Sequence, residues 1–368
     1  MQSLYAYKQA KGANFQIAKD FIADHYLPDL NSMEYQDKEK LEGMKKLALS
    51  IFEDQNSIIP SEDEFETPSE MRLNLAQAQQ LYTEKNKRDF SYYKLKALKE
   101  VDKVYEQYLT ILQLFVLLAK EAEEDPKKNS KSHLGKNKIL IELAKDEEFE
   151  HQLLKRSISF DEEPGFVKRF YKNALLVNNK YIEYCDRVNH TGDEEMAILK
   201  YMIKNIILKH EDSVNFLESE NIYFTEDRET LRSMTVHTFT PYLEAKPVKV
   251  IDLDEEWQEK KDFLSTLFND CIQDEAQLLR HIMPKLKNWD YDRIADTDKI
   301  LLRMALVEMM EYETIPTKVT INEIIEISKS HSTPRSGQFI NGVLDTLSKE
   351  LVAQGIIKKS GRGMLDNK

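Results

Sequence analysis

A group of polar and aromatic residues near the C-terminus has the side-chain types that bind single-stranded RNA. RNA-binding proteins commonly pair Lys and Arg, which contact phosphates, with an aromatic ring on which an unpaired base stacks. An exposed helix N-terminus adds free backbone amides for phosphate. The candidate RNA-contacting residues are Lys318, Arg335, Ser336, Gln338, Phe339 and Asn341. Two alternatives stay open, since Phe339 could pack in a core and Asn341 next to Gly342 could mark close helix packing.

Catalytic and metal-binding patterns are weak in comparison. Glu148 and His151 have the Glu-x-x-His spacing of di-iron ligands on a helix, but such bundles need two pairs. No other His follows an acidic residue at that distance, so we interpret this pair as part of a charged, solvated helix face. Gly-rich phosphate loops, nucleophile elbows and zinc-ligand spacings are also missing from the sequence. We expect no catalytic residues, no metal ligands and no cofactor.

The composition predicts a helix-rich protein of the cytoplasm. The chain has 368 residues, of which 32% are charged and 41% hydrophobic, with only 10 Gly and 10 Pro. Two cysteines, Cys185 and Cys271, form no CxxC motif and are too few for a disulfide framework. The longest apolar run, at 109–119, is too short to span a bilayer, so we expect no membrane association.

The charge is unevenly distributed along the chain. The formal net charge of −13 argues against indiscriminate binding to nucleic acid. From residue 316 onward, however, eight Lys or Arg face five Asp or Glu, a local net charge of +3. A basic end on an acidic chain permits a local RNA site, although an ordinary solvated tail explains the same numbers equally well.

Helical periodicity predicts the elements that position the candidate residues. Between 292 and 351 three amphipathic helices alternate with turns, and Pro316 ends the first of them. Asp298 falls in the first turn of that helix, where a negative charge suits the helix dipole. Thr333 and Pro334 predict the N-cap and first residue of the third helix.

The remainder of the chain also reads as helix, with two polar connections. We expect helices at 14–29, 38–52, 73–82, 91–122, 139–155, 166–188, 193–215, 226–243 and 255–287. Residues 123–138 and 246–254 read as connections, and 248–250 could instead form a short extended segment. The predicted domains are an N-terminal helical region at 1–250, a C-terminal helical domain at 251–354 and a basic flexible tail at 355–368.

Four short motifs resemble the C-terminal half of the NusB family in order and spacing. They are DKILLRMA at 298–305, PTKV at 316–319, INE at 321–323 and FINGVLD at 339–345. Gln2, Leu4, Tyr5 and Tyr7 resemble the pattern of the family's first helix. The resemblance covers about 257–352 well and 1–10 weakly. Residues 12–250 then correspond to a large helical insertion, of the kind found in enlarged NusB-like proteins.

The resemblance implies an all-α NusB-like fold and a non-catalytic role in transcription antitermination. Members of the family bind a short single-stranded element in the leader of nascent ribosomal RNA together with NusE, a ribosomal small-subunit protein. This complex helps the elongating RNA polymerase to ignore terminators. By resemblance, Gln2, Tyr5 and the start of the last helix contact RNA, whereas Tyr5 and Asp298 contact NusE. Simple packing of Tyr5 and a helix-dipole role of Asp298 are the alternatives.

Two departures from the family pattern affect the prediction. The family carries an arginine-rich arm before its first helix, so we expect the natural start of this protein to lie upstream of Met1. Where the family usually has Glu-Asp-Ser-His-Lys-Phe, this chain has PRSGQF at 334–339, which places Arg335 at an acidic position. An added positive charge would strengthen attraction to phosphate. The rival functions are a helical protein–protein adaptor without RNA binding and, more remotely, an RNA methyltransferase, for which no nucleotide-binding loop is present.

Overall fold

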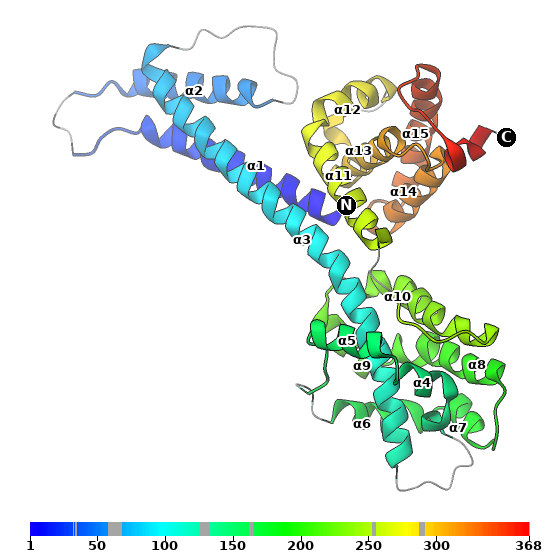
Figure 1. Cartoon of the computed structure of the whole chain (residues 1–368). Coiled ribbons are helices and arrows are strands. Elements are labelled where there is room, and N and C mark those ends of the chain that lie inside the picture. Colours follow the sequence, from blue (N-terminus) through cyan, green and yellow to red (C-terminus); the bar gives the residue numbers. More distant parts are fainter. Residues whose placement is uncertain are drawn as a thin grey trace. The chain divides into compact units, whose positions relative to one another are not determined.

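The structure is a computed structural model that describes residues 1–31, 33, 35–57, 68–125, 133–161, 163, 165–251, 255–286 and 291–367 (Figure 1). The regular elements in this part of the chain are helical, and it contains no strand, so the predicted all-α class is confirmed. Contacts divide the chain into two compact units, one of residues 1–98 with 259–368 and one of residues 99–258. We call them the NusB-like unit and the insertion unit, and describe each by itself.

The NusB-like unit combines the two ends of the chain. Its helices are α1 (Gln2–His25), α2 (Lys38–Gln55), the first part of α3 (Ser69–Glu124), most of α11 (Glu255–Gln273), α12 (Glu275–Ile282), α13 (Asp296–Glu311), α14 (Thr317–His331) and α15 (Ser336–Ala353). Short helical turns follow at η5 (Met283–Lys285), η6 (Tyr291–Arg293) and η7 (Gly361–Asn367).

Helix α13 lies at the centre of the C-terminal core, among α11, α12, α14 and α15 (Figure 1). Periodicity predicts one buried face on this helix, but every residue from Asp298 to Val307 is buried. A helix that is apolar on most sides needs neighbours on most sides. The charged Lys299 and Arg303 are also buried there, and they pair with Asp296 and Glu275.

The first helix and part of α3 complete this core. Tyr7 packs against Phe90 at 5.9 Å between ring centroids, and Phe90 packs against Phe268 of α11 at 5.6 Å. Leu4 is buried in the same cluster. The structure therefore groups residues 1–98 with the C-terminal helices, whereas the sequence-based division separates them near residue 250. Sequence order carries no information on this long-range packing, which explains the difference.

Helix α3 runs without interruption from Ser69 to Glu124, where periodicity predicts two helices at 73–82 and 91–122. The polar stretch between them contains no Gly or Pro and so nothing that ends a helix. Helices α1 and α2 pack beside its N-terminal part and form a small core of their own around Ile22 and Phe52 (Figure 1).

The residues after α15 also differ from the predicted flexible tail. Ile357 is buried in the C-terminal core, and the Lys359 Nζ donates a hydrogen bond to the Tyr312 carbonyl at 2.9 Å. The Ser360 amide donates to the Glu313 carbonyl at 3.0 Å, and η7 follows. Backbone and side-chain contacts thus hold residues 357–360 in place, with Lys359 and Ser360 bonded to the end of α13.

The insertion unit is built around the second part of α3. Its helices are α4 (Lys138–Leu143), α5 (Glu147–Lys155), α6 (Phe166–Phe170), α7 (Asn179–Cys185), α8 (Gly192–Met202), α9 (Glu211–Glu220) and α10 (Phe224–Phe239), with short helical turns at η1 (Leu134–Lys136), η2 (Tyr171–Leu175), η3 (Ile203–Ile207) and η4 (Thr240–Glu244). The sequence leaves open whether 248–250 is a linker or extended. Residues 248–250 lie outside the regular elements and are packed, with the amide of buried Val248 donating a hydrogen bond to Glu142 Oε1 at 2.9 Å.

Candidate nucleic-acid interface

The first turn of α13 carries a buried carboxylate that connects three helices. Asp298 is 5% exposed and accepts hydrogen bonds from the Ser332 hydroxyl at 2.5 Å and the Ser336 hydroxyl at 2.7 Å. Ser332 directly follows α14, and Ser336 opens α15. A buried carboxylate is tolerated where such charge-assisted hydrogen bonds satisfy it. Asp298 thereby fixes the end of α14 and the start of α15 relative to α13.

Further hydroxyl groups extend this network. Thr297 and Ser332 lie 2.9 Å apart, Ser332 and Ser336 lie 3.0 Å apart, and Thr333 and Ser336 lie 2.8 Å apart, measured between side-chain oxygens. The predicted N-cap at Thr333 is displaced, because α15 begins at Ser336 after an N-cap at Arg335. The sequence points to Asp298 and Ser336 but not to Thr297 or Ser332. The density of Ser and Thr at 328–336 could have indicated Ser332, whereas no local signal marks Thr297.

Three of the candidate RNA-contacting residues point outward from α15. Arg335, Gln338 and Asn341 are exposed, and their spacing of three residues places them on one face of the helix. Ser336 is only 2% exposed and belongs to the network below. Phe339 is half-buried and packs against the C-terminal core. The start of α15 therefore presents a cation and two amide groups on a rigid base.

Lys318 lies apart from the other candidates. It sits in the first turn of α14, whereas Arg335 stands beyond the end of that helix. His331 follows Lys318 by thirteen positions of α14, which is about 20 Å at 1.5 Å per residue. The sequence suggests a cluster that includes Lys318, but the structure brings together only the residues at 335–341.

Helix α1 is attached to the same turn of α13. Asp296 is ion-paired with Lys8 and accepts a hydrogen bond from the Gln9 side chain at 3.4 Å. Burial acts to raise the pKa of Asp296, but the hydrogen bond and charge of Lys8, with the charge of Lys299, hold that pKa below its usual range. Two carboxylates of one helical turn thus serve different neighbours: Asp296 holds α1, and Asp298 holds α14 and α15.

The candidate residues of α1 lie just before this attachment. Tyr5 is 39% exposed and Gln2 is half-buried, while Leu4 and Tyr7 face the core. Tyr5 is therefore accessible to a partner, whereas Asp298, the other predicted partner contact, is enclosed by hydroxyl groups. A direct partner contact by Asp298 stays a prediction, and its observed contacts are intramolecular.

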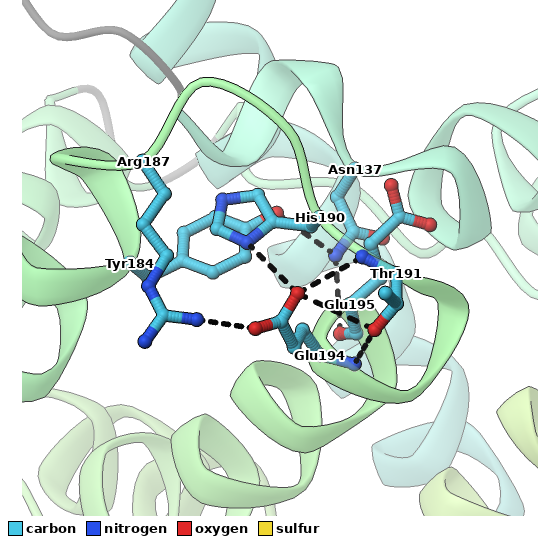
Figure 2. A network of polar contacts seen from close by, with 7 residues as sticks. All are labelled: Asn137, Tyr184, Arg187, His190, Thr191, Glu194 and Glu195. Atoms are coloured by element: carbon cyan, nitrogen blue, oxygen red, sulfur yellow. Dashed lines mark hydrogen bonds and ion pairs between the residues drawn. The ribbon is translucent and has the colours of Figure 1, made fainter.

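A second polar cluster occurs in the insertion unit, at the corner between α7 and α8 (Figure 2). Buried Asn137 donates hydrogen bonds to the Glu195 carbonyl at 3.2 Å and the Tyr184 hydroxyl at 3.4 Å. The ring of His190 stacks on Tyr184 with 3.9 Å between centroids, and Glu194 pairs with Arg187 and caps α8. These contacts stabilise the corner, and the adjoining cavity measures only about 150 Å³.

The described residues hold neither a candidate metal site nor a membrane-spanning helix. Glu148 and His151 are both exposed on α5, as expected for a solvated face, with 3.8 Å between Glu148 Oε1 and His151 Nδ1. Across the described ranges, no group of three or more His, Cys, Asp or Glu side chains could hold a metal ion. Helices long and apolar enough to cross a membrane do not occur in this part of the chain.

Comparisons with known proteins place the similarity in the C-terminal segment. A sequence model of the NusB family matches residues 230–349. Three curated relatives are called transcription antitermination protein NusB. The protein of Chloroherpeton thalassium is 42% identical over 106 residues, which are 29% of this chain and 50% of that protein. The Salinibacter ruber protein is 41% identical over 115 residues, 31% of this chain and 71% of that protein.

The Methylacidiphilum infernorum protein is 34% identical over 93 residues, 25% of this chain and 65% of that protein. The matched part of the chain thus spans between about half and about seven tenths of the length of these relatives. No solved structure matches the chain. The three alignments, each of 93 to 115 residues, leave most of this chain unaligned.

Proposed function

The chain belongs to the NusB family, and from this premise we propose that it is a non-catalytic transcription antitermination factor. It binds a short single-stranded element in the leader of nascent ribosomal RNA, together with NusE, within the elongation complex of RNA polymerase. The observation that carries this proposal is the exposed face of Arg335, Gln338 and Asn341 at the start of α15, inside the segment that matches the family.

The chemistry of this face suits single-stranded RNA. Arg335 supplies a charge for a phosphate, and the amides of Gln338 and Asn341 can each donate to and accept from the edge of an unpaired base. The half-buried ring of Phe339 lies next to Gln338 in the sequence and offers its edge or part of its face to a base. Because the hydroxyl network around Asp298 holds the helix start, these groups keep their positions without RNA, which lowers the entropic cost of binding.

A second protein would compensate for the unfavourable overall charge. A net charge of −13 repels RNA at long range, so a small face with one cation binds weakly by itself. A partner that contacts both this protein and the RNA converts a weak site into a joint one by raising the effective concentration of RNA. We assign Tyr5, which is exposed on α1, as a direct contact of NusE. Asp298 contributes by positioning the start of α15.

The test is a fluorescence-anisotropy titration of a labelled ribosomal RNA leader, with and without purified NusE. We expect tight, salt-dependent binding only when NusE is present. Binding of NusE without any binding of RNA would refute the proposal and favour the helical adaptor, which contacts proteins only. The same titration with an unrelated RNA of equal length controls for sequence-independent attraction.

Arg335→Ala tests the phosphate contact within this complex. Each phosphate contact to a single strand contributes about 0.7 to the slope of log affinity against log salt concentration, so the variant should lose about that amount. Lys329→Ala is the matched control, because Lys329 is also an exposed cation but pairs with Glu326 on α14. An unchanged slope in Arg335→Ala excludes a phosphate contact at this residue.

A further inference from the structure

One stretch of α3 in the NusB-like unit is strongly basic although the chain is acidic. Residues 85–96 contain five Lys or Arg and one Asp, a local net charge of +4 within a chain of −13. This stretch lies outside the segment that matches the NusB family, at 230–349. The family match therefore assigns no role to the charge of this stretch.

Four of its residues share one face of the helix. Arg88, Tyr92 and Lys96 follow one another at intervals of four residues, and Lys85 precedes Arg88 by three. Such intervals stack side chains along one side of a helix. We call Lys85, Arg88, Tyr92 and Lys96 the α3 basic face. The Tyr92 side chain is 60% exposed and the Arg88 side chain 74%, whereas Lys85 and Lys96 are half-buried. Arg88 Nε lies 3.7 Å from Asp89 Oδ1, and Arg88 and Lys96 each stand one turn away from Tyr92.

The neighbouring side of α3 is packed and keeps this face in place. Phe90 and Tyr93 turn inward and contact Tyr7 of α1, with 5.9 Å and 6.5 Å between ring centroids. The Asn14 side chain donates hydrogen bonds to Asn86 Oδ1 at 3.0 Å and Asp89 Oδ2 at 2.7 Å. The helix is thus fixed against α1, and the outward position of Tyr92 follows from that register.

We propose that the α3 basic face binds single-stranded RNA. Lys85, Arg88 and Lys96 contact phosphates, and Tyr92 offers its ring to an unpaired base. The choice of RNA as the polyanion rests on the proposed function. An exposed aromatic ring between cations matches a chain that alternates phosphates with flat bases. A membrane-binding helix needs a broad apolar face, whereas here only Leu95 is a large exposed apolar neighbour.

The consequence is a larger RNA footprint than the start of α15 alone provides. Attraction to phosphates sets most of the sequence-independent affinity for nucleic acid. In a chain of net charge −13, residues 85–96 keep a local net charge of +4 even though Arg88 pairs with Asp89, whereas the start of α15 offers the single cation Arg335. The α3 basic face therefore adds affinity, and the start of α15 adds contacts to particular bases.

Paired variants of the full chain separate this face from net charge. The probe is a fluorescein-labelled oligouridylate of about 15 nucleotides, a length that spans a typical single-strand site. Arg88→Gln/Lys96→Gln removes two charges from the basic face. Lys87→Gln/Lys94→Gln removes two charges from the same stretch of α3 at positions that do not share that face. We expect the first pair to lower the salt slope by about 1.4, at about 0.7 per phosphate contact, and the second to lower it far less.

Substitutions of Tyr92 test the aromatic contact separately, because they leave the charge of the α3 basic face unchanged. Tyr92→Ala should weaken binding by about tenfold, which is within the range for loss of one stacked base, while Tyr92→Phe should retain most of the affinity. Leu95→Ala is the control, since Leu95 is also an exposed large side chain on this stretch. Circular dichroism at matched concentration checks that each variant keeps its helix content.

The outcomes distinguish this inference from the proposed function. Equal effects of the two charge pairs, or wild-type affinity of Tyr92→Ala, overturn the basic face as an RNA site. Polyglutamate that displaces the RNA at equal charge concentration would also overturn it, in favour of an acidic protein partner. If Arg335→Ala weakens the NusE-dependent complex while the α3 variants bind normally, the proposed function stands and this inference fails. Absence of RNA binding by the wild-type chain, with and without NusE, contradicts both.

Discussion

Replacement of Asp298 by Ala should selectively loosen the start of α15. The substitution removes the acceptor of two hydrogen bonds, from Ser332 and Ser336, in a buried site. A hydrogen bond to a charged group contributes about 1.5–3 kcal/mol. The two serines can still bond to each other, since their oxygens already lie 3.0 Å apart. We therefore expect a local loss of about 2–4 kcal/mol rather than the sum of two full contributions.

Hydrogen exchange measured by mass spectrometry is the appropriate assay, because it resolves separate parts of a chain with two units. A loss of about 2–4 kcal/mol raises the exchange rate of amides that open locally by roughly 30- to 700-fold, at about 1.4 kcal/mol per factor of ten. The effect should concentrate in peptides that cover 332–344. Asp296→Ala is the matched control two residues away. It should loosen α1, where Lys8 and Gln9 lose their partner, and leave α15 nearly unchanged.

A double-mutant cycle identifies the contact responsible. If Asp298 acts through Ser336, the combined variant Asp298→Ala/Ser336→Ala should be less destabilised than the sum of the two single variants. Unaltered exchange at 332–344 in Asp298→Ala would refute the reasoning. So would an equal effect of Asp296→Ala on the same peptides, because the two carboxylates would then not serve separate helices.

Three further predictions concern other parts of the chain. Burial, with the charges of Glu226 and Glu100, raises the pKa of Asp227 to about 6, so ionisation of this carboxyl destabilises the folded state as pH rises through that value. Asp227→Asn should therefore raise the free energy of unfolding at pH 8 by about 1 kcal/mol after solvent screening. The same substitution should change it little near pH 4, which thermal unfolding at the two pH values would show. A Cβ at Gly363 would meet the Glu313 carbonyl oxygen at 2.0 Å, so Gly363→Ala should release the segment after Ile357. Trypsin should then cleave this segment faster. Gly342→Ala is the control and should leave the cleavage rate unchanged, because the space around Gly342 is open. Burial raises the pKa of Cys271 to about 12 and of Cys185 to about 11, so both thiols should react slowly at pH 8 until their unit opens in urea, and rapid labelling of the native protein would contradict this.

Local signals in the sequence were sufficient to predict the helical class and the C-terminal helices. Periodicity predicts the helices that the structure shows at 296–311, 317–331 and 336–353 to within a few residues. The motifs at 298–305 and 339–345 indicate the family, and the comparisons confirm it. These properties depend on residues three or four positions apart, so they can be read without knowledge of the fold.

Other features depend on which distant segments meet, and these only the tertiary structure decided. The sequence suggests that Asp298 interacts with the helix dipole or contacts a partner. In the structure its carboxylate is enclosed by the hydroxyl groups of residues 332 and 336. Lys318 and Arg335 are interpreted from the sequence as members of one cluster, yet they lie at opposite ends of α14, which extends about 20 Å from Lys318 to His331. Burial and charge pairing are properties of contacts between elements. Helical spacing predicts which residues share a face, but it carries no information on what covers that face.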